Sequence, residues 1–194
     1  MRDVKKLFKI SVVLESYPRK GFQMLGQLNC LYKHGLCITR LHPEYVSSKY
    51  NLKNMEYYWL SCCKGKKVIS PKSISHMIRI IKLWLRKNGN SLVFMDGIEY
   101  LLIWNDLGRV MHALEEINAI LISANSEMLI CLDPLTLEQR DVEKIISVMD
   151  VKSFDEVTNV VAETKPQQIS ESLQENTGQT VEGLPRSQEL HAIP

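Results

Sequence analysis

The sequence lacks any apolar run long enough to cross a membrane. A membrane-spanning helix needs about 20 consecutive apolar residues, whereas the longest apolar stretch, around residues 78–85, is interrupted by Arg79 and Lys82. The charged N-terminus is followed by neither an apolar signal core nor a small-residue cleavage site. We therefore expect a cytoplasmic protein that makes no contact with a membrane.

Both common phosphate-binding glycine motifs are also missing. A Gly-x-Gly-x-x-Gly pattern occurs nowhere, and the loop after the first expected strand, residues 15–23, has one glycine and no Gly-Lys-Ser/Thr. This lack argues against nucleotide hydrolysis, so we lean towards a protein that is not an enzyme and has no cofactor. Arg19 and Lys20, at the start of the next helix, form a candidate anion-binding pair. Ordinary surface charge at a helix end is the alternative.

No pair of cysteines has the C-x-x-C spacing of a metal or redox site. The five cysteines are odd in number and include an adjacent pair, Cys62-Cys63, close to three lysines. In a cytosolic protein we expect all of them to be reduced thiols. The histidines show no metal-type spacing either, so we predict no metal site.

The composition is that of a folded domain with an appendage. Hydrophobic residues make up 45% of the chain and charged residues 24%, close to the norm for globular proteins. Residues 1–152 carry 22 basic and 15 acidic side chains, a charge of +7, whereas residues 153–194 carry 2 and 7, a charge of −5. Because the last 30 or so residues are polar and aperiodic, we expect 153–194 to be a short helical extension and then a disordered acidic tail.

Strand-like and helix-like patterns alternate along residues 1–152. Alternation of this kind predicts an α/β fold, a three-layer αβα arrangement around a mostly parallel five-stranded sheet. Three helices are expected to begin at a proline that follows a polar residue, in the pairs His42-Pro43, Ser70-Pro71 and Asp133-Pro134. The expected strands are 8–14, 36–41, 57–61, 91–95 and 127–132, and the main expected helices are 18–33, 43–50, 71–87, 107–123 and 134–148.

Ligands of such a sheet bind beyond the carboxyl ends of the strands. The fourth expected strand ends in Asp96, with Glu99 three residues later, and Arg40 and His42 follow the second strand. An aspartate in this position holds magnesium in some nucleotide-binding enzymes. The alternative is that Asp96 caps the following helix, with Glu99 in a capping box, and that Arg40 and His42 are structural.

One helix face is basic. Arg79, Lys82 and Arg86 fall at positions i, i+3 and i+7 of the expected helix 71–87, and apolar residues occupy the opposite face. Such a stripe binds the phosphate backbone of a nucleic acid. The solvated face of an ordinary amphipathic helix has the same pattern, so both interpretations stay open.

Several stretches together resemble a known family. They are residues 35–40, His42-Pro43, 49–50, 59–61, 69–71, 94–101 and Asp133-Pro134 with the closing helix. In this order they resemble the archaeal domain-of-unknown-function family DUF835. The resemblance implies an archaeal source, a frequent association with signalling proteins, and a RecA-like fold that lacks the phosphate-binding loop. It implies no catalytic residue, since none is established for the family.

Three functions follow as hypotheses. The first is a non-catalytic interaction or regulatory module in signal transduction with a protein partner, in which one rim of the sheet is organised by Arg40, His42, Trp59, Ser61, Asp96 and Glu99. The second is a nucleic-acid-binding protein that uses the basic helix face. The third is a nucleotide-binding or enzymatic protein of unrecognised type.

Overall fold

The computed structural model of the chain describes residues 8–50 and 52–159. The expected disordered tail falls mainly in residues 160–194, outside the described residues. The strands are β1 (Ile10–Leu14), β2 (His34–Thr39), β3 (Met55–Leu60), β4 (Val68–Ile69), β5 (Ser91–Asp96), β6 (Glu127–Leu132) and β7 (Asp150–Val151). The helices are α1 (Arg19–Leu28), η2 (Asn29–Leu31), α2 (Pro43–Tyr50), α3 (Ile74–Lys87), α4 (Ile98–Leu102), α5 (Leu107–Ser123) and α6 (Gln139–Val148).

The strands form one parallel sheet in the order β4-β3-β2-β5-β6-β1-β7. The expected α/β class and parallel pairing are confirmed, but the sheet has seven strands rather than five. The two additional strands, β4 and β7, are the edges of the sheet and contain two residues each. A strand of two residues has no hydrophobic period, so periodicity alone does not detect it.

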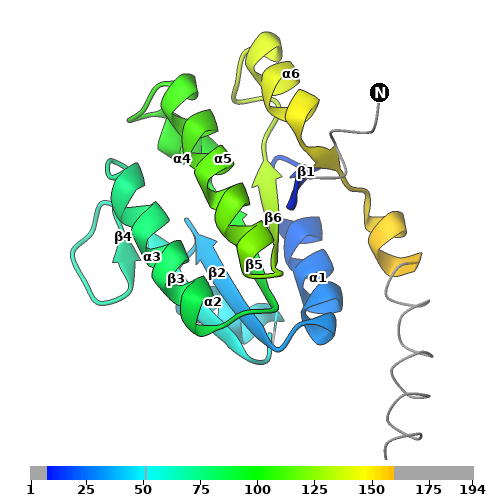
Figure 1. Ribbon diagram of the computed structural model, residues 1–194. Helices are drawn as coiled ribbons and strands as arrows, with labels where there is room; N and C mark the ends of the chain where they lie inside the picture. Colours follow the sequence, from blue (N-terminus) through cyan, green and yellow to red (C-terminus); the bar gives the residue numbers. More distant parts are fainter. Residues whose placement is uncertain (1–7, 51, 160–194) are drawn as a thin grey trace, which may run out of the picture. The chain divides into compact units, whose positions relative to one another are not determined.

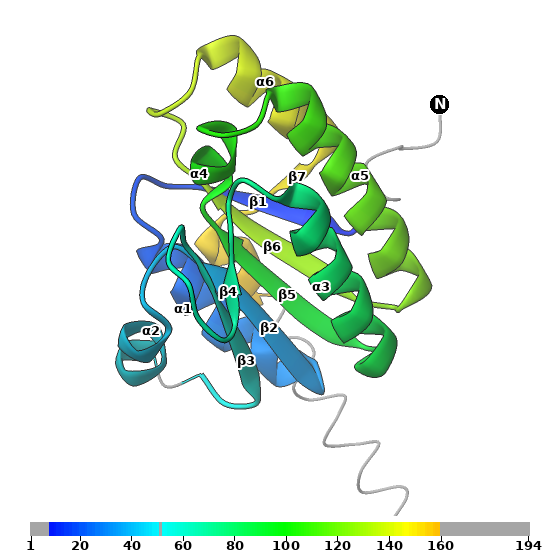
Figure 2. The same cartoon turned by 90° about the vertical axis from the view of Figure 1, so that its left-hand side faces the viewer.

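Helices cover both faces of the sheet. Figure 1 shows α3 and α5 in front of the strands, and Figure 2 shows α1 and α2 on the opposite side. The first face forms a core with α3, α4, α5 and α6, in which Ile81, Ile117 and Ile145 are fully buried. The second forms a smaller core with α1 and α2, centred on Phe22 and Phe94, whose ring centroids are 4.8 Å apart. Burial on both faces explains why the central strands are almost wholly apolar.

Two of the three expected proline helix starts are wrong. α2 begins at Pro43 as expected, but α3 begins at Ile74 rather than Pro71, and α6 begins at Gln139 rather than Pro134. Asp133 still acts locally, because its side chain accepts a hydrogen bond from the N–H of Leu135 at 2.9 Å. A polar residue before proline also favours a turn, and the turn is what forms at both places.

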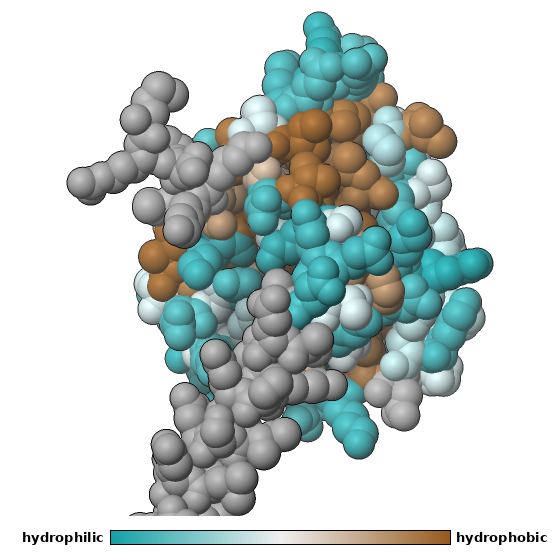
Figure 3. All heavy atoms as spheres, turned by 90° about the vertical axis from the view of Figure 1, so that its right-hand side faces the viewer, coloured by the Kyte–Doolittle hydropathy of each residue, from teal (hydrophilic) through white to brown (hydrophobic). Residues whose placement is uncertain are grey.

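After β7 the chain is helical again over residues 154–159, where Val157 is buried in the second core. On the side of the β7 edge, apolar side chains gather among hydrophilic ones (Figure 3), and the exposed apolar residues of this region include Val148 and Val151. Within the described residues, no helix is both long and apolar enough to span a membrane.

Candidate functional site

At two places in the sheet, neighbouring strands lead into helices that lie on opposite faces. β1 and β2 are followed by α1 and α2 on one face, whereas β5 and β6 are followed by α4, α5 and α6 on the other. In the strand order, β2 lies next to β5, and β6 lies next to β1. Ligands of open parallel sheets bind at such switch points, so the chemistry of these two junctions decides what the rim can do.

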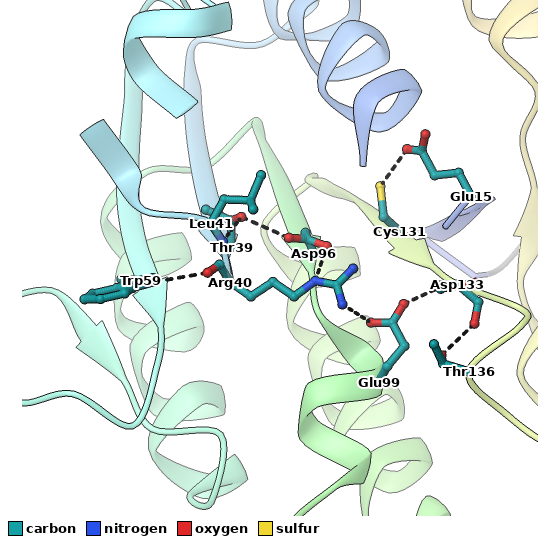
Figure 4. A network of polar contacts seen from close by, with 10 residues as sticks. All are labelled: Glu15, Thr39, Arg40, Leu41, Trp59, Asp96, Glu99, Cys131, Asp133 and Thr136. Atoms are coloured by element: carbon teal, nitrogen blue, oxygen red, sulfur yellow. Dashed lines mark hydrogen bonds and ion pairs between the residues drawn. The ribbon is translucent and has the colours of Figure 1, made fainter. Parts of the chain in front are cut away.

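At the junction of β2 and β5, an arginine and an aspartate form an ion pair. Nε of Arg40 donates to Oδ1 of Asp96 at 3.0 Å, and the hydroxyl of Thr39 donates to Oδ2 at 3.0 Å (Figure 4). The Asp96 side chain is fully buried, whereas that of Arg40 is 31% exposed. Both carboxylate oxygens therefore have partners inside the protein.

Glu99 extends this pair to β6. One carboxylate oxygen accepts the backbone N–H of Asp133, and the other, Oε2, is 3.7 Å from the guanidinium of Arg40. Oε2 is buried and has no hydrogen bond among the described residues. The expected capping box is therefore wrong: Gly97 is the N-cap of α4, with φ 114°, and Asp96 and Glu99 turn to Arg40, Thr39 and Asp133 instead.

Burial shapes the protonation of this cluster. It raises the pKa of the Asp96 carboxyl, against the lowering effect of Arg40 and Thr39. It also raises the pKa of Glu99, against the N–H of Asp133 and the charge of Arg40. Burial alone would lower the pKa of Arg40, but the charges of Asp96 and Glu99 outweigh it and raise that pKa. One guanidinium thus serves two buried carboxyl groups.

At the junction of β6 and β1, a carboxylate occupies the start of α1. Oε2 of Glu15 accepts the backbone N–H of Lys20 at 2.9 Å, and Oε1 accepts that of Gly21 at 2.6 Å. The buried thiol of Cys131 on β6 donates to Oε1 at 3.5 Å. The first N–H groups of a helix have no partner within the helix and attract anions. Here the protein itself supplies the anion.

Gly21 makes this close approach possible. A Cβ atom at this position would clash with Sγ of Cys131 and would lie 2.9 Å from Oε1 of Glu15. Sequence reasoning did not select Glu15. The signal that could have found it is an acid directly after the first strand, with a lone glycine inside the next helix turn.

The remaining expected rim residues are only partly joined to this cluster. Nε1 of Trp59 donates to the carbonyl oxygen of Arg40 at 3.1 Å, and the ring of His42 lies edge-on to Trp59, with centroids 5.0 Å apart. His42 is also 3.9 Å from the exposed carboxylate of Glu44. Ser61 accepts the N–H of the nearby Cys63 in its own loop. Trp59 and His42 are thus linked to the cluster through Arg40, whereas Ser61 bonds within its own loop.

The expected anion-binding residues lie on two separate surfaces. Arg19 and Lys20 are exposed at the start of α1, where Glu15 already holds the Lys20 N–H. Arg79, Lys82 and Arg86 lie on α3, and the first and last of these are exposed. Among the described residues, no group of three or more His, Cys, Asp or Glu side chains could hold a metal ion.

Fold and rim together define a parallel, three-layer αβα domain whose two switch points are closed by its own charged side chains. The chain matches the family described as protein of unknown function DUF835 over residues 15–149. It belongs to that family. None of the curated proteins compared with the chain matches it.

Proposed function

We propose that the chain is a non-catalytic interaction module with a RecA-like fold that no longer binds nucleotides. The observation that carries this proposal is the position of Glu15. Its carboxylate accepts two N–H groups at the start of α1, where a phosphate would lie in a nucleotide-binding relative. Because Glu15 is part of the chain itself, a nucleotide phosphate would have to displace its carboxylate to reach these two N–H groups.

The second junction supports the same conclusion. An aspartate that holds magnesium needs free carboxylate oxygens, whereas both oxygens of Asp96 accept hydrogen bonds from Thr39 and Arg40. The RecA-like relationship itself is a proposal. It is supported by Asp96 at the end of an apolar parallel strand, together with a first strand that leads directly into a helix start.

The role in signal transduction, the archaeal source and the protein partner extend this proposal and rest on the family resemblance. Three large apolar side chains are exposed in the segments that follow the carboxyl ends of β5 and β6, and a partner that covered them would remove apolar area from water. Ile103 is 69% exposed, Trp104 47% and Leu135 84%.

A nucleotide titration tests the proposed function directly. We expect the full chain to show no change in melting temperature with ATP or GTP, with or without magnesium, because only a ligand of the folded state raises it. Glu15→Ala is the informative variant, since removal of the internal carboxylate frees the two N–H groups. Magnesium-dependent binding of a nucleotide by the unmodified chain at micromolar affinity, lost in Asp96→Asn, would show that the proposal is wrong.

Nucleic-acid binding is the second candidate, and one observation favours it. α3 contains no acidic residue, and among the described residues none of Arg79, Lys82 and Arg86 has a carboxylate within 4 Å. Binding of this kind weakens steeply with salt. An unchanged mobility shift after Arg79→Glu and Arg86→Glu would remove this candidate.

The third candidate, an enzyme that uses Arg40, His42 and Asp96 together, receives less support from the geometry. Arg40 and Asp96 neutralise each other, whereas His42 lies against Trp59 and near Glu44. A general base has to reach its substrate proton within hydrogen-bond distance. Loss of a catalysed reaction in His42→Gln, with unchanged folding, would restore this candidate.

A further inference from the structure

One face of α3 combines positive charge with an exposed leucine. Arg79, Lys82, Leu83 and Arg86 fall at positions i, i+3, i+4 and i+7, so they form a single stripe along the helix. We call these four residues the α3 stripe. Leu83 is 58% exposed although it lies in the middle of three cations. The stripe therefore presents both positive charge and apolar area to the solvent.

A groove runs beside the stripe, between α3 and α5. The groove has a volume of about 390 Å³. Leu85, Ile120 and Ala124 give it apolar walls, while Lys82 and Arg86 contribute its charged groups. No acidic side chain lines it within the described part of the chain. The groove therefore offers apolar surface bordered by positive charge.

We propose that the α3 stripe and the adjoining groove bind an acidic amphipathic helix of a partner protein. This inference rests on the proposed interaction role and names the chemistry of the partner. Arg79 and Arg86 are seven residues apart, so the stripe spans about 10 Å, or two helical turns. A partner helix with carboxylates at i, i+3 or i+4, and i+7 would match the cations, and an apolar side chain between them would cover Leu83.

Charge complementarity selects an acidic partner, and the leucine selects a protein. The phosphate backbone of a nucleic acid pairs with Arg79, Lys82 and Arg86 but leaves Leu83 in water. An amphipathic helix removes that side chain from water as well, which adds affinity without adding charge. Binding that depends on Leu83 therefore separates the two classes of partner.

Three probes in solution test the inference on the full chain. The first is a synthetic helical peptide of about 18 residues, or five turns, with glutamate and leucine in amphipathic spacing. The second is oligoglutamate of the same length, and the third is a DNA duplex of about 20 base pairs. Fluorescence anisotropy of labelled probes in low salt gives the three affinities.

Two pairs of variants separate charge from apolar contact. Leu83→Ser is matched by Ile122→Ser, because Ile122 is an apolar residue of α5, 46% exposed, that does not line the groove. The double variant Arg79→Glu, Arg86→Glu is matched by Lys64→Glu, Lys66→Glu, which makes the same change of charge in the exposed loop before β4. The three positions changed in the first variant of each pair, Leu83, Arg79 and Arg86, are exposed, so the fold should persist.

We expect the amphipathic peptide to bind more tightly than oligoglutamate, and Leu83→Ser to weaken it by about tenfold, the loss expected for one buried leucine. The Arg79/Arg86 variant should abolish binding of both peptides, and both matched controls should bind as the unmodified chain does. Equal affinity for the two peptides, no effect of Leu83→Ser, or tight duplex binding that ignores Leu83 would each overturn the inference. None of these results depends on nucleotides. The nucleotide titration therefore tests the proposed function separately from this inference.

Discussion

Replacement of Arg40 by methionine should destabilise the fold strongly at neutral pH. Nε of Arg40 is 3.0 Å from Oδ1 of the fully buried Asp96, and its guanidinium is 3.7 Å from the nearly buried carboxylate of Glu99. Methionine preserves much of the apolar stem and removes the charge and its donors. Loss of one partner of a buried ion pair costs about 3–5 kcal/mol, because the remaining charge stays unpaired in the interior. Since Thr39 still donates to Asp96, we expect the lower end, about 3 kcal/mol.

The pH dependence of this loss follows from the carboxyl groups left behind. Burial already raises the pKa of Asp96 and Glu99 in the folded chain, and loss of the neighbouring positive charge raises both further. A carboxyl whose pKa is raised by folding favours the folded state below its unfolded pKa, and this contribution is lost as the pH rises through the folded pKa. The loss of stability in Arg40→Met is therefore fully present at neutral pH, and it shrinks as the pH falls towards about 4.

Urea unfolding followed by tryptophan fluorescence at neutral and mildly acidic pH measures both effects. Arg140→Met is the matched control, because Arg140 is 72% exposed and its partner Glu138 is 70% exposed, so its loss should cost less than about 1 kcal/mol. The double variant Arg40→Met, Asp96→Asn should recover part of the stability at neutral pH. A loss below about 1 kcal/mol for Arg40→Met, or a loss independent of pH, would refute the reasoning.

Three further changes test other contacts by thermal or urea unfolding. Gly21→Ala should cost about 1–3 kcal/mol by overpacking, whereas Gly26→Ala in the same helix, where a Cβ meets nothing nearer than 3.4 Å, should be neutral or stabilising; equal effects would contradict the tight packing at Gly21. Thr39→Val should cost about 1–3 kcal/mol, because it removes a donor to buried Asp96, and a neutral result would deny that bond. Asp106→Ala removes the N-cap side chain that accepts the N–H of Arg109 at the start of α5 and should lower the free energy of unfolding by about 0.5–2 kcal/mol. An unchanged stability would show that this cap does not contribute.

Most of the fold could be predicted from the sequence because its central strands and long helices have strong patterns. β5 and β6 are short apolar runs buried on both faces, and α5 lies within the bounds that its hydrophobic period predicts. The starts of α3 and α6 could not be placed, because a polar residue before proline is compatible with either a helix or a turn. β4 and β7 depend on pairing with distant strands, which local patterns do not contain.

The candidate site was only partly predictable. The rule that parallel strands end at one edge placed Arg40 and Asp96 together, since β2 and β5 are neighbours. It could not show that they neutralise each other, because this depends on the register of two strands separated by more than 50 residues. The role of Glu15 depends likewise on the fold, through its contacts with Gly21 and with Cys131 from β6.

The two short edges of the sheet have a consequence for the behaviour of the protein at high concentration. A long, bare edge strand is a template on which another chain adds its own strand, and fibril growth proceeds in this way. Here β4 and β7 expose an edge of only two residues each. β4 pairs only with Trp59 and Leu60, however, so within the described residues the outer side of β3 over residues 55–58 has no strand partner. That four-residue stretch is where a strand of a neighbouring molecule would add to the sheet.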